Sequence, residues 1–366
     1  MQVGILGFPQ SGKTTIFNAA TRGTAAVSAY SSQNKPNIGV AKMRDPRLDT
    51  LTQMHKAPKV VPAEVVYVDM PGAPDEFGKS AGIVGELLSH LQRSDALMIV
   101  ARGFEDPSVV NERNRIDAVR DIDEMLSELA FADLAVLERR VQRVKDSFKG
   151  AKQTERAGLE KEQALLEKMQ KELENETHIR HQQLTPEERK FIVGYKFLTD
   201  KPIIAIANVG EEGISKVDAL DEEMAARFAA QGVTTGALCG KLEMELAQMS
   251  PEEETEFRAE MALKGESGLD RMVRLCYEAL GQMTFFTAGP KEVHAWTVAK
   301  GSDALAAAGR IHSDLQRGFI RAEVMGYEDF VECGTEVEAK KRGKLRQEGK
   351  TYVMQDGDII NVLFNV

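Results

Sequence analysis

Apolar residues in this chain first gather in short, nearly unbroken runs that polar segments separate. Runs without alternation are typical of parallel β-strands that helices cover on both faces. Such runs occur at 2–6, 65–68, 96–100, 202–207 and 233–238. Because helix-compatible segments alternate with them, we expect an α/β domain with a parallel sheet, formed by residues 1–120 and 196–282.

The period of the apolar positions changes between these two stretches. From position 121 they recur at spacings of three and four, with charged residues between them, which indicates a helical packing seam. With a turn at 149–151, the pattern predicts an antiparallel coiled-coil hairpin inserted over residues 121–195. The alternative is a pair of ordinary surface helices. The two seams contain Ala130, Leu134, Leu137, Val141, Val144 and Phe148, then Leu159, Leu166, Met169 and Leu173.

Two further patterns complete the expected order of elements. The stretch from Thr185 to Glu188 is a capping box with proline at the first helical position, so a helix should begin there. Beyond it, β-like runs surround helical runs near 303–312 and 335–347, which predicts a small α+β domain over residues 283–366. The β-like runs are 283–286, 294–297, 319–324 and 359–364.

The first predicted strand leads into a segment with the pattern G-x-x-x-x-G-K-T. Its glycines let main-chain N–H groups turn inward, and the following helix adds a positive dipole end, so the segment can hold a triphosphate. Lys13 can reach the β- and γ-phosphates, Thr14 can ligate Mg²⁺, and Thr15 can contact the α-phosphate. The predicted nucleotide contacts here are Gln10, Ser11, Gly12, Lys13, Thr14 and Thr15.

A D-x-x-G motif from Asp69 to Gly72 ends the second main strand. A carboxylate at this place can hold a Mg²⁺-bound water, and the Gly72 N–H can contact a γ-phosphate. We therefore expect Thr14 and Asp69 to form the metal site, and Lys13 and Gly72 to act in catalysis. Ala73 stands where Ras-like hydrolases place a water-positioning glutamine, so intrinsic hydrolysis should be slow.

Two later segments follow strands at the places where such domains read the base. The guanine-reading pattern is N-K-x-D, whereas this chain has N-V-G-E from Asn208 to Glu211. The longer glutamate is badly placed for the paired guanine contact, while Asn208 can donate to and accept from adenine. We therefore predict relaxed specificity or a preference for adenine. The predicted base contacts are Asn208, Val209, Glu211, Cys239, Gly240 and Lys241.

The net charge limits the nucleic-acid partners that we expect for this protein. The 366 residues carry a formal net charge of −10, which argues against bulk capture of nucleic acid, and we expect no DNA partner. The basic run from Lys340 to Arg346 is either an RNA-facing patch or a solvated helix face.

The three cysteines lack metal-ligand spacing and indicate a reducing cytoplasm. The chain shows no signal peptide and no bilayer-spanning run, so we expect a cytoplasmic protein without a membrane partner.

Taken in order, these motifs resemble those of the YchF/Obg-like ATPase family. The resemblance runs from end to end and includes Asp45 to Asp49, Phe104 to Asp106, Phe285 to Val293 and Asn361 to Val366. It implies a Ras-like P-loop G-domain, the inserted coiled coil and a C-terminal TGS domain of β-grasp (ubiquitin-like) fold. It also implies Mg²⁺ dependence, ATP preferred over GTP, and ribosome association.

Three stretches depart from that family's pattern. Gln10 stands where the phosphate loop of the family has asparagine, and the switch reads Q-N-K-P-N-I-G from position 33, without the threonine that would close on Mg²⁺. Ser31 or Ser32 are the candidates to replace it. Residues 73–76, A-P-D-E, replace a small apolar stretch. The chain therefore resembles a divergent branch.

We interpret the chain as a Mg²⁺-dependent nucleoside triphosphatase that acts as a molecular switch. Its expected partners are ATP or GTP and the ribosome, the latter through the TGS domain and the coiled coil. One alternative is a GTP-specific translation-associated GTPase. Another is a nucleotide-gated ribosome- or RNA-binding module with negligible hydrolysis. A small-molecule phosphotransferase is less favoured, because no separate acceptor site is recognisable.

Overall fold

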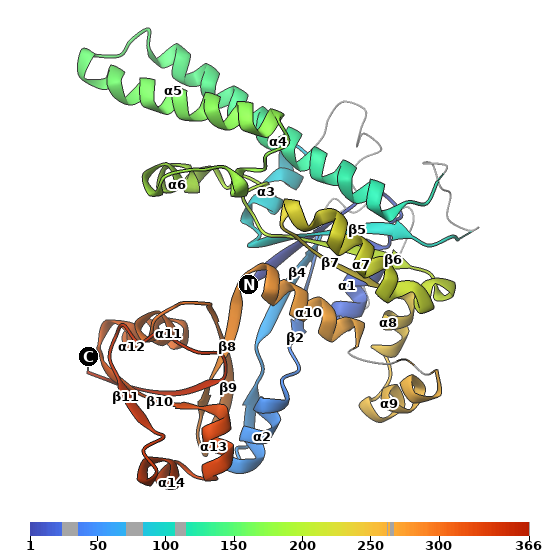
Figure 1. Cartoon of the computed structure of the whole chain (residues 1–366), viewed down its shortest axis with the longest axis vertical. Coiled ribbons are helices and arrows are strands. Elements are labelled where there is room, and N and C mark those ends of the chain that lie inside the picture. Colours follow the sequence, from blue (N-terminus) through green and yellow to red (C-terminus); the bar gives the residue numbers. More distant parts are fainter. Residues whose placement is uncertain (24–35, 71–82, 107–114, 262, 264–266, 366) are drawn as a thin grey trace. The chain divides into compact units, whose positions relative to one another are not determined.

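The chain forms two compact units (Figure 1). The first contains residues 1–40 and 66–275, and the second contains residues 41–65 and 276–366. The second unit thus includes a segment that the apolar pattern placed with the α/β domain. The computed structural model describes residues 1–23, 36–70, 83–106, 115–261, 263 and 267–365.

The first unit is built on a six-stranded sheet with the order β2-β4-β1-β5-β6-β7. The pairs β1–β4, β1–β5, β5–β6 and β6–β7 are all parallel, as predicted. All seven residues of β6 are buried, as expected for an inner strand covered on both faces. The strands are β1 Gln2–Leu6, β2 Asn37–Lys42, β4 Glu64–Asp69, β5 Ala96–Gly103, β6 Ile203–Val209 and β7 Val233–Leu238.

Helices connect these strands and supply the apolar side chains that cover them. A cluster of buried residues joins the sheet, through Leu97, Ile203 and Ala205, to helix residues such as Leu91 and Phe228. The helices are α1 Lys13–Thr21, α3 Gly85–Arg93, α7 Val217–Phe228, α8 Gly240–Leu246, α9 Pro251–Glu260 and α10 Gly268–Ala279. Short 3₁₀ turns are η1 Ile179–His181, η2 Val193–Tyr195, η3 Glu211–Lys216 and η4 Ala229–Gln231.

Two long helices, α4 Ala118–Ser147 and α5 Gln153–Glu174, run side by side away from the sheet (Figure 1). The first half of α4 packs on the sheet through residues such as Ile122 and Leu129. Its second half packs on α5, where Arg140 Nε donates to Glu162 Oε1 at 2.6 Å. The predicted seam residues therefore meet across the two helices, and the predicted boundary at 121 falls inside one continuous helix.

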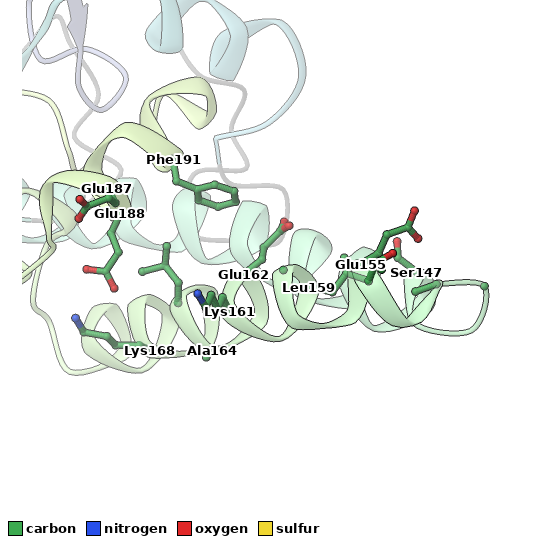
Figure 2. A pocket seen from close by; sticks show the side chains of 15 residues that line it. Ser147, Glu155, Leu159, Lys161, Glu162, Ala164, Lys168, Glu187, Glu188 and Phe191 are labelled. Atoms are coloured by element: carbon green, nitrogen blue, oxygen red, sulfur yellow. The ribbon is translucent and has the colours of Figure 1, made fainter.

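The helix α6 Pro186–Ile192 begins with the predicted capping box, in which Thr185 and Glu188 exchange hydrogen bonds. A groove of about 1180 Å³ lies between α5 and α6, and Phe191 projects over it (Figure 2). None of the predicted nucleotide contacts lines this groove.

Asp133 anchors α4 to the chain segment that leads into β6. Its side chain is fully buried. Oδ1 accepts from the Leu198 N–H at 2.9 Å, and Oδ2 accepts from the N–H and the hydroxyl of Thr199, each at 2.7 Å. Burial raises the pKa of Asp133 to about 6, although these hydrogen bonds act in the opposite direction. One carboxylate thus satisfies three buried donors at the base of the helical hairpin.

The second unit is built on a mixed sheet with the order β11-β10-β12-β8-β9-β3. The pairs β3–β9 and β12–β8 are parallel, whereas β8–β9, β10–β11 and β10–β12 are antiparallel. The strands are β3 Lys59–Val61, β8 Gln282–Ala288, β9 Glu292–Ala299, β10 Phe319–Gly326, β11 Arg346–Glu348 and β12 Asp358–Phe364. The helices are α2 Pro46–His55, α11 Ala304–Ile311, α12 Ser313–Arg317, α13 Tyr327–Cys333 and α14 Glu336–Lys341.

Specific contacts hold residues 41–65 in this second unit. Arg47 is central: its guanidinium forms ion pairs with Asp45 and with Asp356, and it lies 5.2 Å from the centre of the Phe286 ring. The Lys59 side chain pairs with Glu292 across the β3–β9 register. Charge and ring contacts therefore reinforce the main-chain pairing of β3.

The predicted helix over 335–347 is wrong in its second half. α14 ends at Lys341, and Gly343 adopts a φ of 69°, a left-handed conformation that terminates helices. Arg346–Glu348 then forms β11, paired with β10. The sequence pattern missed this change because the charged run 340–346 has no apolar period. Among the described residues, no helix has the length and apolarity that a membrane crossing requires.

Candidate nucleotide-binding site

The phosphate loop lies between β1 and α1, as predicted. Gln10 and Gly12 both have left-handed φ values, 61° and 88°. A Cβ on Gly12 would lie 2.1 Å from Asn208 Nδ2, and one on Gly7 would lie 2.2 Å from the Val100 carbonyl oxygen. Both glycines are therefore required by close packing, and Gln10 accepts a conformation that costs a non-glycine residue about 1–2 kcal/mol.

Lys13, the first residue of α1, is buried within the loop. Its Nζ donates to the carbonyl oxygens of Gly7 at 3.0 Å and Phe8 at 2.9 Å. Burial lowers the pKa of Lys13 to about 8, although the charge of Asp69 acts to raise it. A desolvated ammonium group is thus held inside the loop, where a bound phosphate would offset the free-energy cost of its burial.

Thr14 and Asp69, the predicted metal residues, come together in the structure. The Thr14 hydroxyl donates to Asp69 Oδ2 at 2.8 Å. Burial raises the pKa of Asp69, while hydrogen bonds from Thr14 and Asn37 and the charge of Lys13 lower it. The other oxygen, Oδ1, is buried and has no hydrogen-bond partner among the described residues. A hydroxyl beside a carboxylate with a free oxygen fits Mg²⁺, which prefers oxygen ligands and keeps part of its water shell.

Asn208 lies in the site, but both polar atoms of its side chain form hydrogen bonds with main-chain groups of the protein. Its Nδ2 donates to the Ser11 carbonyl oxygen at 3.1 Å, and its Oδ1 accepts from the Gly240 N–H at 2.9 Å. Asn208 therefore ties the phosphate loop to the segment 239–241. Its predicted contact with the base stays a prediction, and the structure adds this positioning role.

The other predicted base residues fall into two groups. Val209 and Cys239 are buried in an apolar cluster with Leu242, and burial raises the pKa of the Cys239 thiol. Burial in apolar surroundings is typical of a structural cysteine and not of a reactive one. Glu211 and Lys241 are exposed and form an ion pair with a 2.8 Å separation between Oε1 and Nζ. Their pairing joins the two segments that are predicted to read the base.

Two residues of the site have no role that the sequence motifs predict. Phe104 follows β5 and lies beside Gly210, and the Arg102 guanidinium lies 4.7 Å from the centre of its ring. Asn37, the first residue of β2, donates from Nδ2 to Asp69 Oδ2 at 3.2 Å. The signal for Phe104 was its place at the carboxyl end of a parallel strand, where ligands bind. Gly72, Ala73, Ser31 and Ser32 lie outside the described residues.

We expect ATP affinity to fall as pH rises above the pKa of Lys13 in the free protein. A bound triphosphate favours the charged lysine, so binding above about pH 8 must take up a proton, and affinity should fall up to about tenfold per pH unit. Calorimetric titration at one pH in two buffers of different ionisation enthalpy measures this uptake. Equal heats in the two buffers above pH 8 would contradict it.

We expect Asn208→Ala to weaken nucleotide binding about tenfold and to destabilise the fold by about 2 kcal/mol. The substitution leaves the Ser11 carbonyl and the Gly240 N–H without partners, and each such buried group costs about 1–3 kcal/mol. ATP titration and chemical denaturation measure the two effects. A matched control is Asn175→Ala, which removes an exposed asparagine on the hairpin. Wild-type affinity in Asn208→Ala would refute the positioning role.

Comparisons with known proteins agree with this geometry. A family model described as "50S ribosome-binding GTPase" matches residues 2–138, and the YchF-GTPase C-terminal model, described as "Protein of unknown function (DUF933)", matches residues 282–365. The "Ribosome-binding ATPase YchF" of Haemophilus influenzae is 40% identical over 366 residues, which is 99% of each chain. Its namesake from Bacillus subtilis is 37% identical over 369 residues and the full length of both chains. The solved YchF GTPase of Schizosaccharomyces pombe superposes with a TM-score of 0.82 at 28% identity, covering 99% of this chain and 97% of that one.

Proposed function

This chain belongs to the YchF family, and from that membership we propose that it is a nucleoside triphosphatase that prefers ATP, hydrolyses it slowly and associates with ribosomes in the cytoplasm. The observation that carries the proposal is the phosphate loop, in which Lys13 is buried and Thr14 is bonded to Asp69. Curated relatives that align over their whole length carry the name ribosome-binding ATPase.

The residues of the loop bind and orient the triphosphate. Lys13 is already desolvated, so its charge acts on the phosphates in a medium of low polarity, where electrostatic stabilisation is strong. When bound, Mg²⁺ would neutralise part of the charge of the β- and γ-phosphates, and Thr14 and Asp69 are the residues that would hold it. Gly72 as a further phosphate contact remains part of the proposal.

The preference for ATP rests on the replacement of the guanine-reading aspartate. Glu211 pairs with Lys241 at the surface, which supports the view that its carboxylate is not held for a paired contact with guanine. Competition between ATP and GTP for the purified protein tests this preference. Tighter binding of GTP than of ATP would overturn it and favour the GTPase alternative.

The hydrolysis step is tested by single-turnover reactions with bound ATP, with and without ribosomes. Slow phosphate release that ribosomes alter would support the proposal. Bound ATP that survives both conditions would favour a nucleotide-gated binding module instead. That alternative is motivated by Ala73, which cannot position a water as glutamine does.

We further propose that α4 and α5 form a coiled-coil hairpin and that residues 283–366 form a TGS domain of β-grasp fold. The packing of Leu137 and Val141 with Leu166 and Met169 supports the first. The strand order β9-β8-β12-β10-β11, with α11 between β9 and β10, supports the second. Both are the proposed ribosome-facing elements.

The basic run from Lys340 is a weaker candidate for the ribosomal contact than its sequence indicates. Arg342 pairs with Glu338 and Glu332, and Lys344 pairs with Asp329. Because neighbouring carboxylates offset these charges, we do not assign RNA binding to this run.

A further inference from the structure

Asn37 contacts the candidate metal site without belonging to the phosphate loop or to the D-x-x-G motif. It is the first residue of β2, and its Nδ2 donates to Asp69 Oδ2 at 3.2 Å. The same oxygen accepts from the Thr14 hydroxyl at 2.8 Å. Two donors from two different elements therefore hold one oxygen of the carboxylate.

This arrangement fixes the rotation of the Asp69 side chain. With Oδ2 held by Thr14 and Asn37, the second oxygen is the one left for another ligand, and Oδ1 is buried without a hydrogen-bond partner in the described part of the chain. A buried acceptor without a partner is costly, so it is best explained by a ligand that is bound during function. A partner that orients a metal-binding carboxylate commonly accounts for a 10–100-fold difference in metal affinity.

We propose that Asn37 is a positioning residue for the magnesium ion of the nucleotide complex, which it serves by holding the Asp69 carboxylate with Oδ1 available to the ion or to its water. The inference rests on the proposed nucleotide-binding function and adds a residue that acts through Asp69. It also places the beginning of β2 in contact with the metal site.

The Asn37–Asp69 hydrogen bond also connects two strands, β2 and β4, that continue into other parts of the chain. β2 and β4 are the strands whose ends meet at the Asn37–Asp69 hydrogen bond. At their other ends both strands enter residues 41–65 of the second unit, where the Met43 N–H donates to the Ala63 carbonyl oxygen at 2.8 Å. Asn37 thus joins the metal site to the two strands that lead into the second unit.

The test is the dependence of ATP affinity on Mg²⁺ in the full-length protein. ATP is titrated calorimetrically into wild type, Asn37→Ala and Ile38→Ala, in excess Mg²⁺ and in excess EDTA. Ile38 is the matched control, because it is the next residue of β2 and its side chain is exposed. We expect Asn37→Ala to lower the Mg²⁺-dependent gain in affinity about tenfold, with the affinity in EDTA and the melting temperature close to wild type. Ile38→Ala should retain the full gain.

The remaining outcomes of this titration distinguish failure of the inference from failure of the proposed function. An unchanged Mg²⁺-dependent gain in Asn37→Ala would overturn the inference and leave the proposed function intact. Equal losses with and without Mg²⁺ would also overturn it, because they indicate a structural role only. Failure of wild type to bind ATP would instead refute the proposed function. If Asn37→Ala does not fold, Asn37→Ser is titrated in its place, and its shorter donor should leave part of the gain.

Discussion

Lys13→Met is expected to lower kcat/KM for ATP hydrolysis by about 10²–10³-fold, the usual effect of removing one preorganised electrostatic contact to a reacting group. The structure supplies the reason, since Lys13 Nζ is held by two carbonyl oxygens inside the phosphate loop. Steady-state phosphate release with ATP measures the change. Lys161→Met, at an exposed position on α5, is the control and should keep wild-type activity.

The same variant should not lose stability, which separates a catalytic loss from unfolding. The pKa of Lys13 is lowered to about 8 from 10.5, so the unfolded chain binds more protons than the folded protein between these pH values. Wild-type stability should therefore rise as pH increases from about 8 to about 10.5, by up to about 3 kcal/mol. Lys13→Met should lack this rise. ATP turnover within a few-fold of wild type would contradict the assigned role of Lys13.

Asp133→Ala is expected to lower the free energy of unfolding by about 3 kcal/mol at neutral pH. It leaves the Leu198 N–H and both donors of Thr199 without partners, and each costs about 1–3 kcal/mol, while loss of a buried charge offsets part of the total. Chemical denaturation measures the change. Asp123→Ala, which removes a more exposed aspartate of the same helix, should have a much smaller effect.

The loss of stability in Asp133→Ala should depend on pH, and the raised pKa of Asp133 gives the direction of that dependence. The pKa of Asp133 is raised to about 6 in the folded protein from 3.8, so between these values the folded protein binds more protons than the unfolded chain. The stability that Asp133 contributes therefore falls as pH rises from about 4 to about 6. The difference between wild type and Asp133→Ala should be larger at pH 5 than at pH 7. A difference that grows with pH would contradict the raised pKa.

The phosphate loop and the inner strands could be predicted because their signals are local. A glycine-rich loop after an apolar strand is recognisable in a few consecutive residues, and the structure confirms its place between β1 and α1. The meeting of Thr14 with Asp69 was also predictable, since the carboxyl ends of parallel strands share one edge of the sheet.

The features that sequence reasoning missed depend on contacts between distant residues. β3 is three residues long and pairs with β9, which lies far along the chain, so no local period reveals it. Asn208 was predicted to belong to the site. Its hydrogen bonds with Ser11 and Gly240 were not predictable, because they depend on how three segments that are distant in sequence lie in space. The Asn37–Asp69 contact was not predicted either. The alternation of apolar residues in β2 is too weak to reveal the strand that places Asn37.

The placement of residues 41–65 in the second unit has a consequence for the order of events during synthesis. These residues leave the ribosome early, but the rest of their unit begins only at residue 276, and its first strand, β8, begins at residue 282. At about 5–20 residues per second, the ribosome needs roughly 10–40 s to make the chain between them. During that interval β3 lacks its partner strand β9, and α2 lacks the rest of its unit. A C-terminal fragment that begins at residue 276 would in turn expose the edge of β9 that β3 covers.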